Sequence, residues 1–390
     1  MRTDTRNRIE RFLTEHAPPT PCLVVDTDAV SSRVRELTAE FPDAGLRYAV
    51  KANPEPAVVA AVLAAGGGFD VAGPAETDLC LAAGARPEAL SYGNTIKKPA
   101  DIAHAYARGV REFVSDAEGD VDNLACFAPG ASVSVRLLLD GPSSATPFGR
   151  KFGCEPPVAV ELLRRAAARG LDPAGLSFHV GSQQLDPVAW EHGISASAKV
   201  FAELAADGIA LRRLNIGGGF GVPYAEPAPA LADYAAAVRN SLRAHFPAGV
   251  PELLLEPGRI LVAGAGLLRT EVILVAGRAS DDPRRWVYLD AGRYNGLAET
   301  ENEAIRYRFE PVGDRGGEHG PVIIAGPTCD GDDVLYQHTP YALPLALRAG
   351  DLLDIPDTGA YTTSYSSICF NGIEPLKTYC LAGGEPVDAH

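Results

Sequence analysis

The first two thirds of the chain alternate short apolar runs, rich in β-branched residues, with longer stretches rich in Ala and Leu. The short runs have the length and composition of strands that are buried on both faces of a parallel sheet. In the longer stretches apolar residues recur every three or four positions, and several begin at Pro and stop at Gly, as helices do. Eight runs are expected to be strands: Arg47–Val50, Gly68–Val71, Leu90–Gly93, Glu112–Ser115, Val133–Leu139, Gly175–His179, Arg213–Ile216 and Leu253–Glu256.

Eight strand–helix units in a row predict an α/β fold, a (β/α)8 barrel of the TIM type, in which helices surround a closed ring of parallel strands. An open, doubly wound sheet is the alternative, but such sheets rarely need eight units in succession. We place the barrel at residues 27–262.

The pattern changes after about Val262, where strand-like runs are separated by Gly, Pro and Asp and few helices are evident. An amphipathic helix is expected before the Pro18–Pro19 pair, and residues 20–26 have the pattern of one more strand. We therefore expect a C-terminal, mainly β domain, a β-barrel or sandwich, formed by residues 263–390 together with residues 1–26. Its strand-like runs occupy residues 270–278, 284–292, 321–330, 351–356, 361–370 and 376–382.

The composition is that of a soluble globular protein, with 46% hydrophobic and 22% charged residues among 390. No apolar run is long enough to span a bilayer, and the charged N-terminus lacks the apolar core of a secretory signal. The seven cysteines are scattered without metal-ligand spacing. This pattern predicts reduced thiols, a cytoplasmic protein and no metal site.

The formal net charge of −15 disfavours nucleic acid and anionic membranes as partners. It is compatible with a cationic substrate, although a solvated acidic surface is the more common reason for such a charge.

Unusual polar residues follow the ends of the expected barrel strands. Lys51 comes just after the first strand and His179 ends the sixth. The segment "NIGGGFG" (215–221) follows the seventh strand, and "LEPGR" (255–259) ends the eighth. Because catalytic groups of such barrels gather at the carboxyl ends of the strands, we expect these residues to share one rim.

Glycines after the seventh strand, with Gly258 and Arg259 after the eighth, lie where such barrels commonly bind phosphate. A flexible turn is the alternative explanation for the glycines. A lysine beside a phosphate site suggests a Schiff base with an aldehyde cofactor. Glu256 could keep a pyridine nitrogen protonated, and His179 could stack on the ring unless it is a structural histidine. Pyridoxal 5′-phosphate fits these features together, whereas "GGGFG" lacks the spacing of a dinucleotide fingerprint.

A second group of candidates lies in the expected β domain. "GPTCDGDDVL" (326–335) sets Cys329 beside Asp330, and residues 357–372 are rich in Tyr, Ser and Thr. A lone cysteine is usually a small buried hydrophobe. Neighbouring acids do not acidify a thiol, so Cys329 suits a proton donor better than a resting thiolate nucleophile.

From about Thr20 to Leu381 the chain resembles the fold type III pyridoxal-phosphate-dependent decarboxylases. The motifs "YAVKANP", "HVGSQ", "GGGFG", "EPGR", "GPTCD" and "GAYT…FNG" occur in the family's order. This family includes the ornithine/lysine, arginine and diaminopimelate decarboxylases, and the bacterial ornithine/lysine group is the most similar. The resemblance implies an alanine racemase-like barrel and a homodimer. Each active site would join one barrel rim to the partner's Cys-Asp and Tyr segments.

The resemblance also implies roles for individual residues. Lys51 matches the Schiff-base lysine, His179 the residue that stacks on the ring, and Glu256 the partner of the pyridine nitrogen. Cys329 matches the group that returns a proton to the α-carbon after CO₂ leaves. Further positions near the cofactor are Asp70, Glu76, Arg136, Ser182, Gly218, Gly219, Gly258, Arg259 and Tyr361.

Asp330 matches the acid that holds the distal amine of the substrate. Diaminopimelate decarboxylases resemble "CES" at this point, whereas this chain has "CDG". An acid there attracts a distal ammonium and repels a distal carboxylate by several kcal/mol in a poorly solvated site. The resemblance therefore implies decarboxylation of L-ornithine or L-lysine to putrescine or cadaverine, a step of polyamine biosynthesis.

Two further residues are expected to contact the substrate: Tyr294, and Glu303 as a second acid chosen from Glu299, Glu301 and Glu303. One alternative is a decarboxylase of another amino acid, such as diaminopimelate or an intermediate of specialised metabolism. An alternative of another class is a non-catalytic regulator, which the retained Lys51 and Cys329 disfavour.

Overall fold

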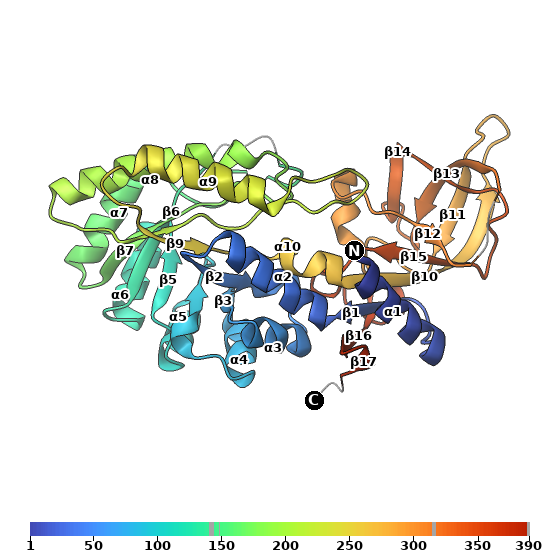
Figure 1. Ribbon diagram of the computed structural model, residues 1–390, viewed down its shortest axis with the longest axis horizontal. Coiled ribbons are helices and arrows are strands. Elements are labelled where there is room, and N and C mark those ends of the chain that lie inside the picture. The colour runs from blue at the N-terminus through green and yellow to red at the C-terminus, as the bar shows by residue number, and fades with distance from the viewer. Residues whose placement is uncertain (140–143, 148, 314–316, 388–390) are drawn as a thin grey trace. The chain divides into compact units, whose positions relative to one another are not determined.

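The computed structural model describes residues 1–139, 144–147, 149–313 and 317–387 (Figure 1). The chain divides into two compact units. The barrel unit comprises Ser31–Gly221 and Ala228–Ile260, and the β unit comprises Met1–Val30, Val222–Pro227 and Leu261–His390.

The barrel unit contains a closed barrel of eight parallel strands, which confirms the predicted (β/α)8 fold. The first and last strands pair directly, with Leu46 opposite Leu255, and this closure excludes the open sheet. The strands are β2 (Ala44–Ala49), β3 (Gly68–Val71), β4 (Leu90–Tyr92), β5 (Glu112–Ser115), β6 (Ser132–Arg136), β7 (Asp172–Ser177), β8 (Arg213–Asn215) and β9 (Glu252–Leu255).

Helices separate successive strands and lie outside the ring (Figure 1). Four of them, α3, α4, α5 and α7, start at a proline, whose fixed φ suits the first helical turn and whose missing N–H is not needed there. The helices are α2 (Thr27–Glu40), α3 (Pro56–Ala64), α4 (Pro74–Ala82), α5 (Pro99–Ala107), α6 (Glu118–Phe127), α7 (Pro156–Ala168), α8 (Trp190–Ala206), α9 (Leu231–His245) and α10 (Arg259–Val262).

Six barrel strands end one to three residues earlier than the sequence predicts, and of these β4, β8 and β9 each end one residue early. After β2 the chain turns at once into the 3₁₀ turn η1 (Val50–Ala52), so Val50 is not part of the strand. Strand β7 ends at Ser177, which leaves His179 beyond the strand rather than at its end. Strand β6 ends at Arg136, because the next residue leaves the sheet to form an isolated bridge with Cys154.

The β unit contains a mixed sheet with the strand order β14-β13-β11-β10-β1-β16-β17, with β15 paired to β10 and β12. The expected strand at residues 20–26 is β1 (Cys22–Asp26), antiparallel to β10 and parallel to β16. Helix α1 (Thr3–His16) buries Ile9, Phe12 and Leu13 in a core shared with β1. The other strands are β10 (Gly266–Gly277), β11 (Arg285–Leu289), β12 (Glu310–Pro311), β13 (His319–Ala325), β14 (Val334–Pro344), β15 (Leu352–Pro356), β16 (Lys377–Ala382) and β17 (Glu385–Pro386).

The strand expected at residues 361–370 is wrong. This segment forms the 3₁₀ turn η6 (Thr363–Tyr365) and runs into η7 (Phe370–Gly372). Cys369 and Asn371 have φ values of 60° and 54°, in the left-handed region that a strand does not use. Strand β14 was not predicted, because Pro340 and two polar residues at 337–338 interrupt its apolar pattern.

Within the described ranges, no helix is long and apolar enough to cross a membrane. The same residues contain no group of three or more His, Cys, Asp or Glu side chains that could hold a metal ion.

Candidate active site

Lys51 lies in the turn η1, directly beyond β2 at the carboxyl end of the barrel. Its side chain is 49% exposed, and its Nζ lies 3.3 Å from Oδ2 of the buried Asp70. Ala49 pairs with Asp70 across β2 and β3, and this register brings the two charged groups to the same height. Gly93 is required next to them, because a Cβ there would lie 2.0 Å from Asp70 Oδ1. The lysine amine is therefore held at the rim but remains accessible.

Glu256 follows β9 and lies on the same rim. Its backbone N–H donates to Gly217 O over 2.9 Å, and its Oε1 accepts a hydrogen bond of 2.6 Å from Asn215 Nδ2. Burial, helped by the negative charge of Asp70, raises the pKa of Glu256 to about 7. The positive charges of Lys51 and Arg136 and the bond from Asn215 act in the opposite direction. The carboxyl group is therefore sensitive to any charge placed beside it.

His179 has a defined tautomer. Its Nδ1 accepts a hydrogen bond of 2.9 Å from the backbone N–H of Gly181, so the ring proton is on Nε2. Burial lowers the pKa of His179 well below its usual value, and the positive charges of Arg136 and Lys51 lower it further. The imidazole is therefore neutral, and a neutral ring can stack on an aromatic ligand without charge repulsion.

The glycine turn 217–219 packs closely against neighbouring backbone. A Cβ at Gly218 would lie 2.2 Å from Glu256 O, and one at Gly219, where φ is +99°, would lie 2.3 Å from Gly181 O. Beside it the buried Arg259 donates from Nη2 to Ser182 Oγ over 2.9 Å. The backbone N–H groups of a glycine turn, next to a guanidinium and a hydroxyl, are groups that bind a phosphate.

Arg136 acts on the rim through its charge, and Glu76 through a hydrogen bond to the backbone. Arg136 ends β6, and its guanidinium stands 5.0 Å from the centre of the Phe152 ring. Its positive charge acts on both Glu256 and His179. Glu76, in the first turn of α4, accepts a hydrogen bond of 2.7 Å from the N–H of Ala72. Glu76 therefore closes the loop that follows β3.

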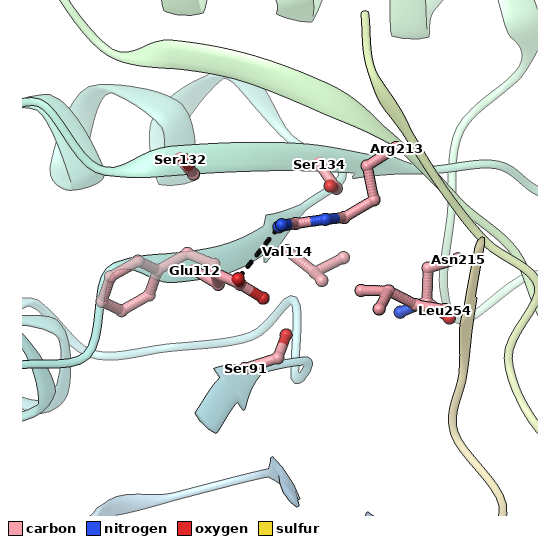
Figure 2. A pocket seen from close by; sticks show the side chains of 9 residues that line it. Ser91, Glu112, Val114, Ser132, Ser134, Arg213, Asn215 and Leu254 are labelled. Carbon is pink, nitrogen blue, oxygen red and sulfur yellow. Dashed lines mark ion pairs between the residues drawn. The ribbon is translucent and has the colours of Figure 1, made fainter. Parts of the chain in front are cut away.

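A polar pocket inside the barrel was not predicted from the sequence (Figure 2). Glu112 and Arg213, at the starts of β5 and β8, form an ion pair of 3.1 Å across it. Ser91, Ser134 and Asn215 also line it. Asn215 thus lies between this pocket and Glu256.

In the β unit, Cys329 and Asp330 lie in an exposed loop after β13. Asn371 binds Cys329 twice: its Oδ1 accepts the backbone N–H over 3.0 Å, and its Nδ2 donates to Sγ over 3.2 Å. Asp330 Oδ1 accepts the N–H of Asp332 over 2.8 Å, which shapes the loop.

Tyr294 belongs to the same cluster. Burial, together with the charge of Asp330 and a hydrogen bond to it, raises the pKa of Tyr294. Its ring centre lies 4.7 Å from that of Phe370, and its carbonyl accepts the N–H of Ser367 over 2.9 Å. The structure therefore brings Cys329, Asp330 and Tyr294 together. Tyr361 lies just before η6 with φ of 56°.

Glu303 has a different environment. Its carboxylate accepts the backbone N–H groups of Gln337, His338 and Thr339 over 2.7 to 2.8 Å, and the Thr339 hydroxyl over 2.5 Å. Both oxygens thus fix the backbone of β14. Contact of Glu303 with a substrate amine stays a prediction.

Two functional candidates were missed at the level of sequence, Asn215 and Asn371. Both lie within motifs singled out there, "NIGGGFG" and "FNG". Their partners, Glu256 and Cys329, are about 40 residues away along the chain, so only the fold reveals the contacts.

Comparison with known proteins gives a consistent result. Residues 27–263 match the family model of the pyridoxal-dependent decarboxylases, pyridoxal binding domain. A lysine/ornithine decarboxylase of Selenomonas ruminantium is 33% identical over 355 residues, which cover 91% of this chain and 88% of the relative.

Two solved structures have the same fold. A lysine/ornithine decarboxylase of Vibrio vulnificus complexed with cadaverine superposes with a TM-score of 0.85 at 30% identity, covering 98% of this chain and 99% of that one. An arginine decarboxylase of Paramecium bursaria Chlorella virus bound to agmatine has a TM-score of 0.87 at 26% identity, with 96% and 100% covered.

Proposed function

The chain belongs to the family of pyridoxal-dependent decarboxylases, and from this premise we propose that it removes the α-carboxyl group of a basic L-amino acid, ornithine or lysine. The observation that carries the proposal is the arrangement at the barrel rim. There an accessible Lys51 amine lies beside Asp70, and the rim also holds neutral His179 and the carboxyl of Glu256.

The residues at the rim fit pyridoxal 5′-phosphate. Lys51 Nζ would bind its aldehyde carbon, and Glu256 would accept a hydrogen bond from the ring nitrogen. The glycine turn, Ser182 and Arg259 would hold the phosphate. When bound, this cofactor supplies an acceptor for the electron pair that remains on the α-carbon after CO₂ leaves.

The protein's own residues bind the reactants and move the protons. Asp70 holds the Lys51 amine at the rim. His179 offers an uncharged face to the ring. The Cys329 thiol gives its proton to the α-carbon, and the bond from Asn371 Nδ2 fixes the position of that sulfur.

Asp330 carries the choice of substrate. Its carboxylate attracts the distal ammonium of ornithine or lysine and disfavours a distal carboxylate. The lysine/ornithine and arginine decarboxylases described above were captured with cadaverine and with agmatine, both of which are cations. This agrees with a basic amino acid as the substrate here.

We further propose a homodimer in which the Cys329–Asp330 loop of one subunit completes the barrel rim of the other. Residues 27–262 would be the cofactor domain, and residues 1–26 with 263–390 the β domain that contributes to the shared site. All seven cysteines, which lie within the described residues, are free thiols, in keeping with a cytoplasmic location.

The test is a substrate panel of ornithine, lysine, arginine and diaminopimelate, with products identified by mass spectrometry. Putrescine or cadaverine is expected as the main product. Asp330→Asn should lower kcat/KM for these substrates about 100-fold, in line with the loss of a close charge pair. The neighbouring exposed Asp332→Asn is the matched control. Turnover of diaminopimelate alone, or of no amino acid, would overturn the proposal.

A further inference from the structure

We propose that Asn215 is a positioning residue that fixes the orientation and the charge of Glu256 toward the ring nitrogen of the cofactor. Asn215 ends β8 and Glu256 follows β9, and these adjacent strands pair Asn215 with Leu254. Asn215 Nδ2 donates to Glu256 Oε1 over 2.6 Å. The inference rests on the proposed role of Glu256 but concerns a residue to which that proposal gives no role.

The orientation of the Asn215 side-chain amide is fixed by the hydrogen bond that its oxygen accepts. Asn215 Oδ1 accepts the backbone N–H of Gly217 over 2.9 Å, in the turn that starts the glycine segment. A backbone N–H can only donate, so the side-chain oxygen must face Gly217 and the NH₂ group must face Glu256. Asn215 can therefore donate to the carboxyl group but cannot accept a proton from it.

A fixed donor favours the ionised carboxylate over the protonated acid. The other charged groups around Glu256 are Asp70, which opposes ionisation, and Lys51 and Arg136, which favour it. The bond from Asn215 also favours ionisation of Glu256, and it occupies the carboxylate oxygen Oε1. It would leave Oε2 as the carboxylate oxygen that faces the ring nitrogen when the cofactor is bound, and an ionised carboxylate there would favour a proton on that nitrogen.

The bond is also protected from water. Asn215 is 2% exposed and lines the pocket inside the barrel, beside Ser91 and Ser134 (Figure 2). Hydrogen bonds to charged groups in such surroundings are stronger than those at a surface.

A turn-forming role alone is the competing explanation, and the barrel supplies an internal comparison. Asn94, after β4, accepts the N–H of Ile96 over 3.2 Å in the same two-residue spacing, but its Nδ2 donates to the carbonyl of Ala72 over 3.3 Å. Asn94 thus forms the same kind of turn but does not donate to a carboxylate. Asn94→Leu is therefore the matched control for Asn215→Leu.

The experiment measures binding to the cofactor-stripped full-length chain without substrate. The two ligands are pyridoxal 5′-phosphate and its analogue with C–H in place of the ring nitrogen. Asn215→Leu should weaken binding of pyridoxal phosphate about tenfold, as for a lost hydrogen bond to a charged group, and leave binding of the analogue nearly unchanged. Asn94→Leu should not change the ratio of the two affinities. An equal loss for both ligands in Asn215→Leu would overturn the inference, since a merely structural role predicts it.

Two further variants keep the test decisive. In a Glu256→Gln background, Asn215→Leu should not change the ratio of the affinities for pyridoxal phosphate and for the analogue. A further loss of affinity for pyridoxal phosphate alone would contradict action through Glu256. If Asn215→Leu does not fold, Asn215→Asp retains the acceptor for Gly217. In Asn215→Asp the affinity for pyridoxal phosphate, relative to that for the analogue, should fall as pH rises and the new carboxyl ionises. A relative affinity that equals that of the wild type at every pH would refute the inference. Failure on the substrate panel would not affect these binding results, so the inference and the proposed function fail separately.

Discussion

Asn371 binds Cys329 at two points, donating from Nδ2 to Sγ over 3.2 Å and accepting the Cys329 N–H at Oδ1 over 3.0 Å. The two bonds fix both the backbone and the sulfur of an exposed loop residue. A donor aimed at sulfur also stabilises the thiolate that remains after the thiol gives up its proton. The two bonds support the proposal that Cys329 is the proton donor, which Asn371 would orient and assist.

Asn371→Ala should impair delivery of the proton to the α-carbon. The proton would then reach a carbon of the cofactor instead of the α-carbon more often. The share of the carbonyl side product of decarboxylation-dependent transamination should rise several-fold, as expected when the hydrogen bond to the sulfur and the one to the Cys329 N–H are both lost. Mass spectrometry of the products measures this share.

The control for this variant is Asn302→Ala, which removes another exposed asparagine of left-handed conformation, with φ of 53°, from the same unit. Cys329→Ala should show the same defect more strongly. Wild-type product ratios in both Cys329→Ala and Asn371→Ala would rule out the proton-donor role.

The barrel could be predicted from the sequence because its strands are largely buried and four of its helices begin at proline, so local pattern and tertiary fold agree. The segment 361–370 was mistaken for a strand for a related reason. Its Tyr and Thr residues favour strands, but its two left-handed residues, Tyr361 and Cys369, depend on contacts made elsewhere in the fold.

The candidate site could be predicted only in part. Lys51, His179 and Glu256 stand out in the sequence because each is a polar residue that follows the apolar run of a strand. Asn215 and Asn371 do not stand out, since an asparagine beside glycine ordinarily indicates a turn. The role of each asparagine depends on which side chain its amide group contacts in the fold, and residue spacing along the chain does not predict that contact.

Lys51→Ala should abolish the visible absorption band of lysine-bound cofactor and reduce turnover by several orders of magnitude, because Lys51 would supply the amine that binds the cofactor aldehyde. Absorbance spectroscopy of the purified protein and CO₂ release are the measurements. Lys199→Ala, an exposed lysine on α8 of the same unit, serves as the control and should behave as wild type. Retention of the band in Lys51→Ala would refute the assignment of this lysine.

The raised pKa of Glu256 predicts how stability depends on pH in protein stripped of cofactor. Burial raises the pKa of this carboxyl from 4.5 to about 7, so between these values the folded chain holds a proton that the unfolded chain has released. The free energy of unfolding, relative to Glu256→Gln, should therefore fall by about 3 kcal/mol as pH rises through this range and level off above it. Urea unfolding of both proteins across the range gives the difference, and a constant difference would contradict the assigned pKa.

Lys97 forms a buried ion pair that should support the barrel rather than the reaction. Its fully buried Nζ lies 2.7 Å from Asp120 Oδ2 and also donates to the carbonyls of Asn94 and Val114 over 3.1 and 2.7 Å. Lys97→Met would leave Asp120 without its cation and should lower the free energy of unfolding by about 3–5 kcal/mol. The adjacent Lys98→Met removes an exposed ammonium and should cost less than about 0.5 kcal/mol. Urea unfolding of the two variants tests this contrast, and equal stabilities would show that the buried pair contributes nothing to the fold.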